Sequence, residues 1–199
     1  MHLISLFAAL CAFDEPAQAD ASNWYLTGGL YQETVDFELR FAGGNRDTLE
    51  FEDDLAFRIG VGKPISEDWN IEFEFGFGES DWDGILIFID GSTERARLEY
   101  EYFQAAALMC YQMNVSDTFK VVPKAGVGFT NAEFTSILDS LGTDSESETE
   151  MTFKFGIHAE FALSDTTELF AGYRHEFTDF EDDTEATSTG LIFGARISF

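Results

Sequence analysis

The sequence predicts an all-β fold in which eight antiparallel strands run up and down and close into a barrel that crosses a membrane. Apolar and polar side chains alternate with period two through most of the chain, which is the pattern of strands with two different faces. Short and long connections follow one another in turn between the alternating segments. No apolar run is long enough for a transmembrane helix, whereas a barrel strand needs only about 9–11 residues.

Eight alternating segments can be counted, and turn residues separate them. The connections after the second, fourth and sixth segments are short, and those after the other segments are longer and acidic. This layout is typical of a membrane barrel with short turns on one side and longer loops on the other. In chain order, the predicted strands are residues 23–37, 51–63, 69–79, 95–111, 118–130, 151–163, 168–180 and 187–199.

The first segment changes its apolar face part-way along. Trp24, Leu26 and Leu30 share one parity, whereas Val35 and Phe37 share the other. We expect a β-bulge near residues 32–34, because one additional residue would restore the alternation. A second interpretation is that residues 37–41 belong to a hairpin that continues above the membrane with Leu49 and Phe51.

The segment at residues 151–163 illustrates the two faces. Phe153, Phe155 and Ile157 share one face, and Lys154 and Glu160 share the other. A soluble ligand-binding barrel would need the apolar face inside. With the phenylalanine-rich face toward lipid, both faces are satisfied, and the charged residues can pair in the lumen. By parity, the predicted lumen network comprises Arg58, Glu72, Glu74, Arg95, Arg97, Glu99, Glu101, Lys120, Lys124, Lys154, Glu160, Arg174, Glu176 and Arg196.

The N-terminus has the features of a cleavable secretory signal. A short apolar run from Leu3 to Phe13 precedes Ala17-Gln18-Ala19, a small-x-small cleavage pattern. We therefore expect residues 1–19 to be a signal peptide and residues 20–199 to be the barrel domain.

The composition is strongly acidic. The chain carries 38 acidic residues against 11 Lys and Arg, a formal net charge of −27. Loss of residues 1–19 removes Asp14 and Glu15 and leaves 36 acids against 11 bases, a net charge of −25. Such a chain is not expected to bind nucleic acid. Only Cys110 remains after processing, so an internal disulfide is excluded.

The last ten residues, 190–199, alternate and stop on an aromatic residue. In this, and in its overall layout, the chain resembles the small eight-stranded outer-membrane barrels of the OmpA transmembrane-domain and opacity-protein type. In that family, the barrel assembly machinery reads the terminal strand, which corresponds here to Gly194, Ile197 and Phe199. Ile192 departs from the pattern, because a polar residue usually stands there. The resemblance implies location in the outer membrane of a Gram-negative bacterium, in contact with lipid and lipopolysaccharide.

Catalysis is not expected, although barrels of this size include enzymes that modify lipid A. His175 is the natural candidate for such a site. The deacylase family places a Ser two residues after its catalytic His and then an Asn, but Phe177 and Thr178 stand at those positions here.

No cofactor or dedicated metal site is expected either, because no Cys–His spacing suggests zinc. The acidic connections could hold divalent cations through oxygen ligands. Residues 139–150 are expected to form a mobile Ser/Thr/Asp/Glu-rich loop. The candidates in the other connections are Glu79, Asp81 and Asp83, and then Asp179, Glu181, Asp182, Asp183 and Glu185.

An eight-stranded barrel is just wide enough for side chains to fill it. The sequence therefore favours a non-catalytic barrel with a salt-bridge-plugged lumen and a role in envelope integrity, adhesion or surface display. The alternatives are a lipid A-modifying enzyme and a narrow channel of low conductance.

Overall fold

The computed structural model describes residues 24–40, 46–51, 54–87, 93–138, 142–180 and 184–199. Within these ranges there is no helix long and apolar enough to cross a membrane. The strands are β1 Tyr25–Arg40, β2 Arg46–Glu50, β3 Asp54–Pro64, β4 Trp69–Ile87, β5 Thr93–Tyr111, β6 Met113–Asn114, β7 Phe119–Leu138, β8 Gly142–Ala162, β9 Thr167–Phe180 and β10 Thr184–Ser198.

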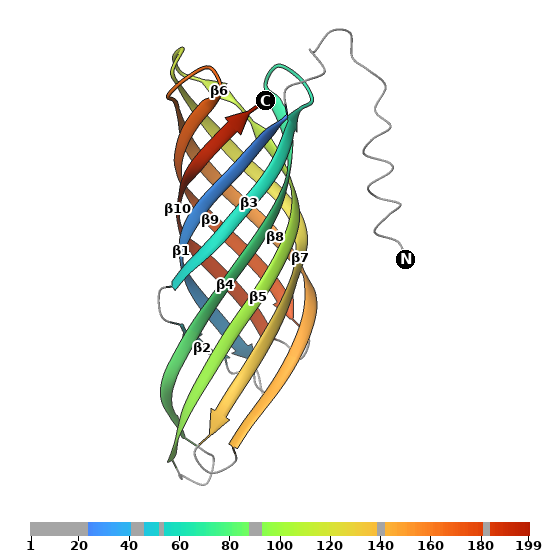
Figure 1. The fold of residues 1–199 in the computed structure, drawn as a ribbon. Coiled ribbons are helices and arrows are strands. Elements are labelled where there is room, and N and C mark those ends of the chain that lie inside the picture. The colour runs from blue at the N-terminus through green and yellow to red at the C-terminus, as the bar shows by residue number, and fades with distance from the viewer. Residues whose placement is uncertain (1–23, 41–45, 52–53, 88–92, 139–141, 181–183) are drawn as a thin grey trace, which may run out of the picture.

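Eight of these strands form a closed wall (Figure 1). Their order is β10-β9-β8-β7-β5-β4-β3-β1, and the first and last strands pair with each other. That closing pair is antiparallel and runs without a break from Tyr25 opposite Ser198 to Leu39 opposite Thr184. Closure pairs the backbone polar groups of the wall, as a strand-built membrane protein requires. The predicted antiparallel eight-stranded barrel is confirmed.

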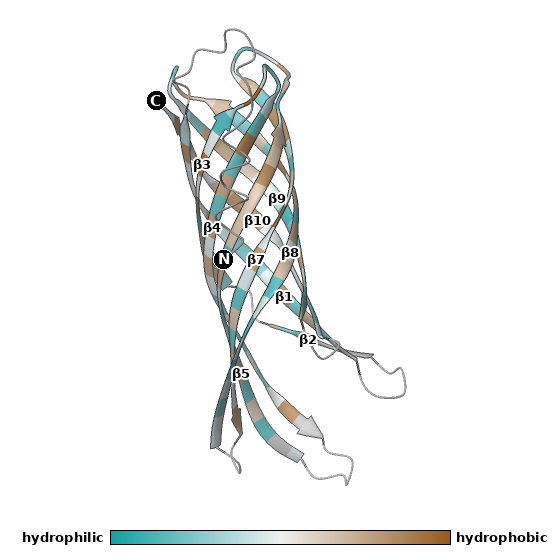
Figure 2. Ribbon diagram, turned by 90° about the vertical axis from the view of Figure 1, so that its right-hand side faces the viewer, coloured by the Kyte–Doolittle hydropathy of each residue, from teal (hydrophilic) through white to brown (hydrophobic). Residues whose placement is uncertain are grey.

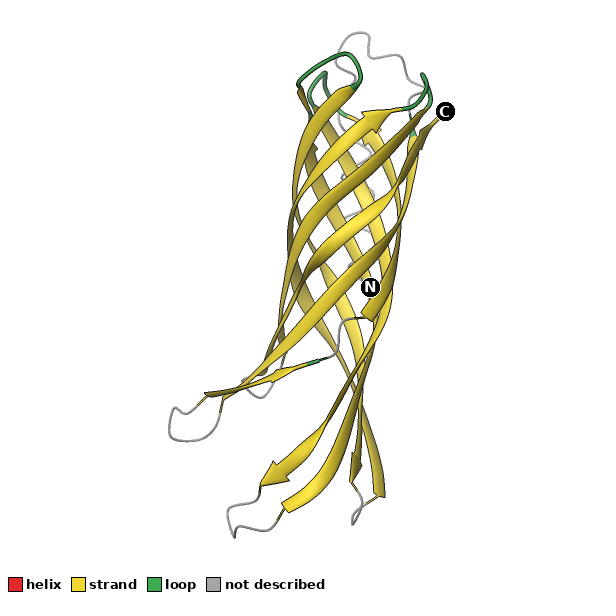
Figure 3. Cartoon of the chain, turned by 90° about the vertical axis from the view of Figure 1, so that its left-hand side faces the viewer, coloured by secondary structure: helices red, strands yellow, loops and turns green. Residues whose placement is uncertain are grey.

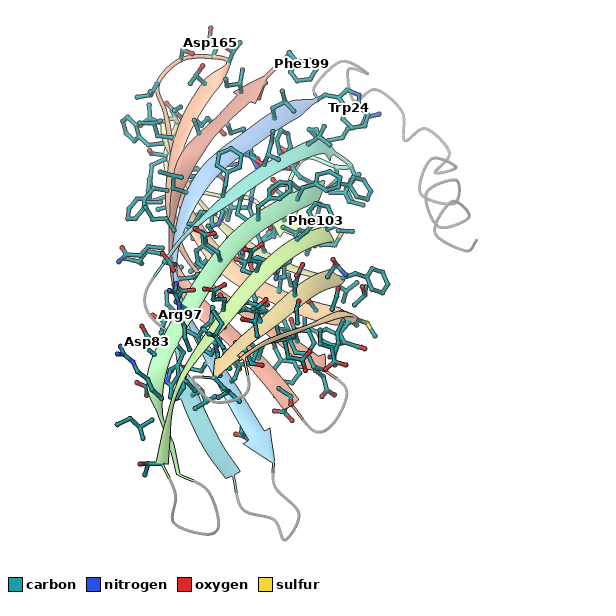
Figure 4. The ribbon with its side chains drawn as sticks, turned by 60° about the horizontal axis from the view of Figure 1, so that its bottom comes forward. Trp24, Asp83, Arg97, Phe103, Asp165 and Phe199 are labelled. Carbon is teal, nitrogen blue, oxygen red and sulfur yellow. The ribbon has the colours of Figure 1, made fainter. Side chains whose placement is uncertain are left out.

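Three short turns and both ends of the described chain lie at the same end of the barrel (Figure 1). The turns share one geometry, in which two successive N–H groups donate to the carbonyl that opens the next strand. In the first turn, Ile65 and Ser66 donate to Trp69, and the Ser66 hydroxyl accepts from the Trp69 N–H at 3.2 Å. A serine therefore caps the turn and fixes the register of the following strand. Figure 4 shows Asp165, Trp24 and Phe199 together at this end.

At the other end, four strands extend past their neighbours (Figures 2 and 3). β3 pairs with β4 only as far as Phe57 opposite Phe77, and β9 pairs with β8 only from Thr178 opposite Thr152. Beyond these points, residues 78–87, 93–102, 130–138 and 142–151 form a four-stranded sheet, called here the surface sheet.

The surface sheet corrects the expectation of a mobile loop at residues 139–150. Residues 142–150 are a regular part of β8 paired with β7, and residues 139–141 lie outside the described ranges. The Asn131 amide donates to Thr149 Oγ1 at 2.7 Å, and the Ser145 hydroxyl donates to Glu133 at 2.9 Å. Cross-strand hydrogen bonds from small polar side chains thus favour a strand where composition alone suggests disorder.

The expected bulge near residues 32–34 is wrong, whereas the alternative of a hairpin is confirmed, because Phe37 of β1 pairs with Leu49 of β2. β1 keeps one register with β10, and its odd-numbered residues from Tyr25 to Phe37 are all buried on the lumen side. Glu33 pairs with Asp54 of β3 and Asp36 pairs with Glu50 of β2, so the register of β1 with this neighbour changes by one residue between the two pairings. The change in apolar parity has a different cause, because Val35 and Phe37 enter an apolar part of the lumen.

That apolar part is a layer of buried side chains at the surface-sheet end of the lumen. Phe37 lies 5.0 Å from the ring of Tyr100 and 5.5 Å from that of Phe134, measured between ring centroids. Phe51 and Phe180 complete the contacts around Phe37. We call this group the aromatic layer. The aromatic layer lies between the charged part of the lumen and the surface-sheet end of the barrel.

The outer wall is apolar, as a lipid-facing surface should be. Large side chains such as Leu30, Phe77, Phe155 and Phe193 are about half exposed. Figure 2 shows apolar and polar positions alternating along the strands, and Figure 4 shows Phe103 directed outward. Trp69 lies against Tyr111 at the turn end, with 4.8 Å between ring centroids, in keeping with an aromatic girdle at the membrane interface.

Candidate functional site

The lumen holds equal numbers of opposite charges. Five carboxylates and five Lys or Arg side chains among the described residues are at most 5% exposed. A balanced interior is the arrangement expected where water is scarce, because a buried charge is tolerated only when it is paired. The negative excess of the chain therefore lies outside this buried set. The ten buried charged residues are Glu33, Glu72, Glu74, Glu160 and Glu176, with Arg58, Lys124, Lys154, Arg174 and Arg196.

The layer nearest the turns is built on Glu160. Arg196 donates to Glu160 at 2.7 Å, and Lys120 lies 3.4 Å from the same carboxylate. Lys120 also pairs with the half-buried Glu168 at 2.8 Å. The Arg196 guanidinium sits 4.1 Å from the centre of the Tyr25 ring, a cation–π contact. The lumen is thus closed at the turn end by paired charges over an aromatic ring.

In the next layer, farther from the turns, Lys124 pairs with Glu72, with Nζ at 3.0 and 3.1 Å from the two carboxylate oxygens. His158 is 1% exposed and stacks on Phe170 with 4.9 Å between centroids. Its two ring nitrogens have no protein partner. A cavity of about 10 Å³ adjoins His158, Lys124 and Glu72, roughly the space that one water molecule needs. One buried water there would satisfy one of the two ring nitrogens.

The centre of the network is Glu74. Both terminal nitrogens of Arg174 donate hydrogen bonds to this carboxylate, one of them at 2.6 Å, and Lys154 Nζ lies 3.3 Å away. Lys154 also donates to Gln104 at 2.7 Å and to Glu176 at 3.2 Å. Residues from four strands therefore converge on one point, and a two-pronged Arg–carboxylate contact is the strongest geometry available to such a pair.

The charged layer nearest the surface sheet centres on Arg58. Its guanidinium donates to the Tyr102 hydroxyl at 2.9 Å and lies 3.5 Å from Glu176 and 3.7 Å from Glu33. Tyr102 in turn donates to Glu33, as does Ser188 at 2.7 Å. Sequence reasoning missed Glu33, because a bulge in β1 would have turned it outward. The uniform burial of odd positions from Tyr25 onward is the signal that finds it.

Glycines on the inner face make room for these large side chains. A Cβ atom at Gly76 would collide with the Arg58 guanidinium, and one at Gly78 would collide with the Tyr102 ring. A Cβ at Gly62 would overlap the Tyr25 ring. The inner-face glycines thus make room for aromatic rings as well as for charged side chains.

Four predicted members of the network do not lie in the lumen. Arg95, Arg97, Glu99 and Glu101 occupy odd positions of β5, and it is the even positions of β5, such as Tyr100 and Tyr102, that are buried. Alternation gives the wrong face for this part of β5 because its lumen-facing residues are aromatic. Its outward residues lie beyond the lipid-facing wall, on the side of the surface sheet, and can therefore be charged. Arg97 is exposed and pairs with Asp81 at 2.6 Å and with Glu99 at 3.2 Å (Figure 4).

The acidic cation candidates lie on the outer wall above the lipid-facing residues. Glu79, Asp81 and Asp83 share the outward face of β4, and Glu79 stands directly opposite Glu101 of β5. Asp179 is exposed on β9 opposite Glu185, whereas Glu181, Asp182 and Asp183 lie outside the described ranges. Within the described chain, no three His, Cys, Asp or Glu side chains are grouped so as to hold a metal ion.

His175 projects from the outer wall, away from the lumen network. Its direct neighbours across the strands are Phe155 and Thr189. The imidazole therefore sits in a largely apolar, lipid-facing environment, which differs from the polar cleft that a hydrolytic base needs.

At Ile192, where the family pattern has a polar residue, the side chain is 1% exposed and packs with Tyr31 and Phe170. It lines the same small cavity as Lys124, His158 and Arg174, so it is an apolar side chain within the charged part of the lumen. Ile197 and Phe199 face outward, at 52% and 65% exposure, and the Phe199 N–H donates to the Trp24 carbonyl at 2.9 Å.

Comparison with protein families matches residues 3–199 to the outer membrane protein beta-barrel domain. The chain belongs to this family. Its members lie in the outer membrane, and the expected family, fold and location are thereby confirmed. Comparison with curated protein sequences finds no match.

Several solved structures share the fold at low sequence identity. The chain is similar to Ail, the attachment invasion locus protein of Yersinia pestis, at 15% identity and a TM-score of 0.51, covering 89% of this chain and 99% of that one. Neisserial surface protein A is 15% identical with a TM-score of 0.53, covering 88% and 97%. OprG of Pseudomonas aeruginosa is 12% identical with a TM-score of 0.56, covering 90% and 96%. The outer-membrane protease OmpT of Escherichia coli is 7% identical with a TM-score of 0.55, covering 93% and 99%.

Proposed function

We propose that this protein is a non-catalytic outer-membrane barrel that acts through its cell-surface hairpins, in envelope integrity, adhesion or surface display. The single observation that carries the proposal is the filled lumen. Ten paired charges and the aromatic layer occupy the lumen, so the barrel wall serves as an anchor. The fold family includes adhesin-like proteins and a protease, so the choice rests on this chain's own residues.

A closed lumen makes a simple prediction for planar lipid bilayers. The folded protein is expected to give no discrete conductance steps, because salt bridges and aromatic rings block the path. A channel would instead show steps that change with Lys154→Ala or Arg174→Ala. Discrete steps in the unmodified protein would therefore overturn the plugged-lumen proposal.

The absence of catalysis is tested on lipid A. We expect a Gram-negative host expressing the protein to keep its lipid A mass profile, and His175→Ala to leave that profile unchanged. The reason is that His175 has an apolar setting on the outer wall. A change in acyl chains that depends on His175 would make the protein an enzyme.

The partners follow from the location. We propose contacts of the outer wall with lipid and lipopolysaccharide, and recognition of Gly194, Ile197 and Phe199 by the barrel assembly machinery. We further propose that residues 1–19 are cleaved on export and that divalent cations associate loosely with the acidic outer face of the surface sheet. Deletion of Phe199 tests the assembly signal, and it is expected to lower the yield in the outer-membrane fraction while leaving synthesis unchanged.

A further inference from the structure

The surface sheet has an open edge along β4. β3 stops pairing with β4 at Phe77, and no strand of the described chain pairs with the outer side of residues 78–87. In an antiparallel sheet, alternate residues of an edge strand present their N–H and C=O groups sideways. An edge of this length is a template on which another extended chain can add a strand. Figures 2 and 3 show the surface sheet projecting beyond the barrel, and the β1–β2 hairpin diverges from it.

We propose that the β4 edge captures an extended, basic segment of another protein by strand addition. This inference rests on the proposed surface-interaction function and names its partner class. The backbone supplies the affinity, and the side chains on the two faces of β4 decide which sequences fit.

The outer face of the edge selects basic side chains. Glu79 lies opposite Glu101, which lies opposite Glu133, so three carboxylates stand in one row across β4, β5 and β7. Like charges directly opposite one another destabilise a sheet. A Lys or Arg placed next to Glu79 by an added strand would relieve this repulsion. Two residues further along, Asp81 is already paired with Arg97, and Asp83 follows on the same face.

The inner face of the edge selects apolar side chains. Trp82 is partly buried against the aromatic layer, and Gly84 follows on the same face. An apolar residue next to Trp82 would extend that layer and cover more of the indole. The preferred segment therefore alternates basic and apolar residues, with the bases outward and the apolar residues inward.

A second copy of the chain fits this edge poorly. Antiparallel pairing of two β4 edges centred on Trp82 would set Asp81 of one copy opposite Asp83 of the other. The other edge of the surface sheet that no described strand pairs with, residues 142–151 of β8, is different in kind. Its inner face carries Asp144 and Glu146 next to further acids, and its outer face carries Ser and Thr. The β8 edge has no counterpart of Trp82 and serves as the matched control.

The test uses the full-length protein folded in lipopolysaccharide-containing nanodiscs and a labelled ten-residue peptide of alternating Lys and Val. Fluorescence anisotropy is expected to show saturable binding. The double variant Glu79→Lys/Asp83→Lys is expected to weaken binding about tenfold, and Trp82→Ala to weaken it without a change of charge. The matched double variant Asp144→Lys/Glu146→Lys, on the other edge, is expected to leave the affinity unchanged. Faster migration of unboiled protein on a denaturing gel establishes that each variant is folded.

Two peptides methylated on alternate backbone nitrogens separate strand addition from general charge attraction. The charge and side chains of both equal those of the parent peptide, but only one has lost the N–H groups that face β4. We expect one of the two to bind and the other to fail. Equal binding of both, loss of binding with the β8 variant alone, or no binding of the parent peptide would each overturn the inference. The proposed function would survive any of these results, because its own tests are the silent bilayer and the unchanged lipid A.

Discussion

The most informative perturbation is the removal of one charge at the centre of the lumen, by Glu74→Gln. The side chain keeps its shape, but Arg174, at 2.6 Å, and Lys154, at 3.3 Å, lose their shared anion. The remaining carboxylate nearby is Glu176, 3.5 Å from Arg174 and 3.2 Å from Lys154, and it also serves Arg58. The balanced lumen then holds one excess positive charge. Breaking a buried pair in this way costs about 3–5 kcal/mol of unfolding free energy.

The free energy is measured by urea unfolding of the protein in phospholipid vesicles, followed by tryptophan fluorescence. Arg174→Met alone is expected to cost a similar amount, because it leaves the Glu74 carboxylate underpaired. The double variant Glu74→Gln/Arg174→Met restores charge balance and is expected to cost clearly less than the sum of the two single changes. Arg97→Gln is the matched control, because its ion pairs are exposed and are worth only about 0–1 kcal/mol.

The result that would refute this reasoning is a loss below about 1 kcal/mol for Glu74→Gln with additive behaviour of the double variant. That outcome would mean that water or ions enter the lumen and screen the network. A plugged lumen would then no longer follow from the charge pairing.

Two other predictions concern the wall and the surface hairpin. Gly126→Ala is expected to destabilise the barrel by about 1–3 kcal/mol, because the new Cβ would strike the Ala107 carbonyl oxygen, whereas Gly28→Ala meets nothing within 4 Å and is expected to be neutral in the same urea assay. Asp36, above the lipid-facing wall, has a pKa raised by partial burial and by the neighbouring Glu50. Its ionised form is therefore disfavoured in the folded hairpin, so its contribution to stability is present below the ordinary Asp pKa of about 4 and is lost as the pH rises through the raised value. Asp36→Asn should slow amide hydrogen exchange in the β1–β2 hairpin at pH 7 relative to wild type and make no difference below pH about 4; a difference of equal size at both pH values would show that the effect is not ionic.

The faces of β7, β8 and β9 could be read directly from the sequence. In β8, phenylalanines at 153, 155 and 161 alternate with Lys154, His158 and Glu160, and a one-residue slip would put every charge into lipid. The same contrast placed Lys124, Arg174 and Arg196 in the lumen. Alternation suffices where one face meets hydrocarbon and the other meets paired charge.

β5 shows where this reasoning fails. Residues Ala105, Ala106 and Ala107 offer no contrast between faces, and Tyr100 and Tyr102 alternate with Glu99 and Glu101. Above the lipid-facing wall both faces are free to be polar, so parity no longer distinguishes inside from outside. The length of the surface sheet was likewise not predictable, because its pairing depends on cross-strand contacts such as that of Asn131 with Thr149. Glu33 and the aromatic layer followed from a register that only the closed barrel reveals.

The central claim is that the apolar face of this chain meets lipid and that the charged face is enclosed. The most direct measurement is expression with a functional signal peptide, fractionation of the membranes, and comparison of unboiled and boiled protein on a denaturing gel. The account predicts recovery in the outer-membrane fraction and faster migration of the unboiled protein. A soluble periplasmic protein with no shift on boiling would contradict it, because the phenylalanine-rich face would then have to lie inside.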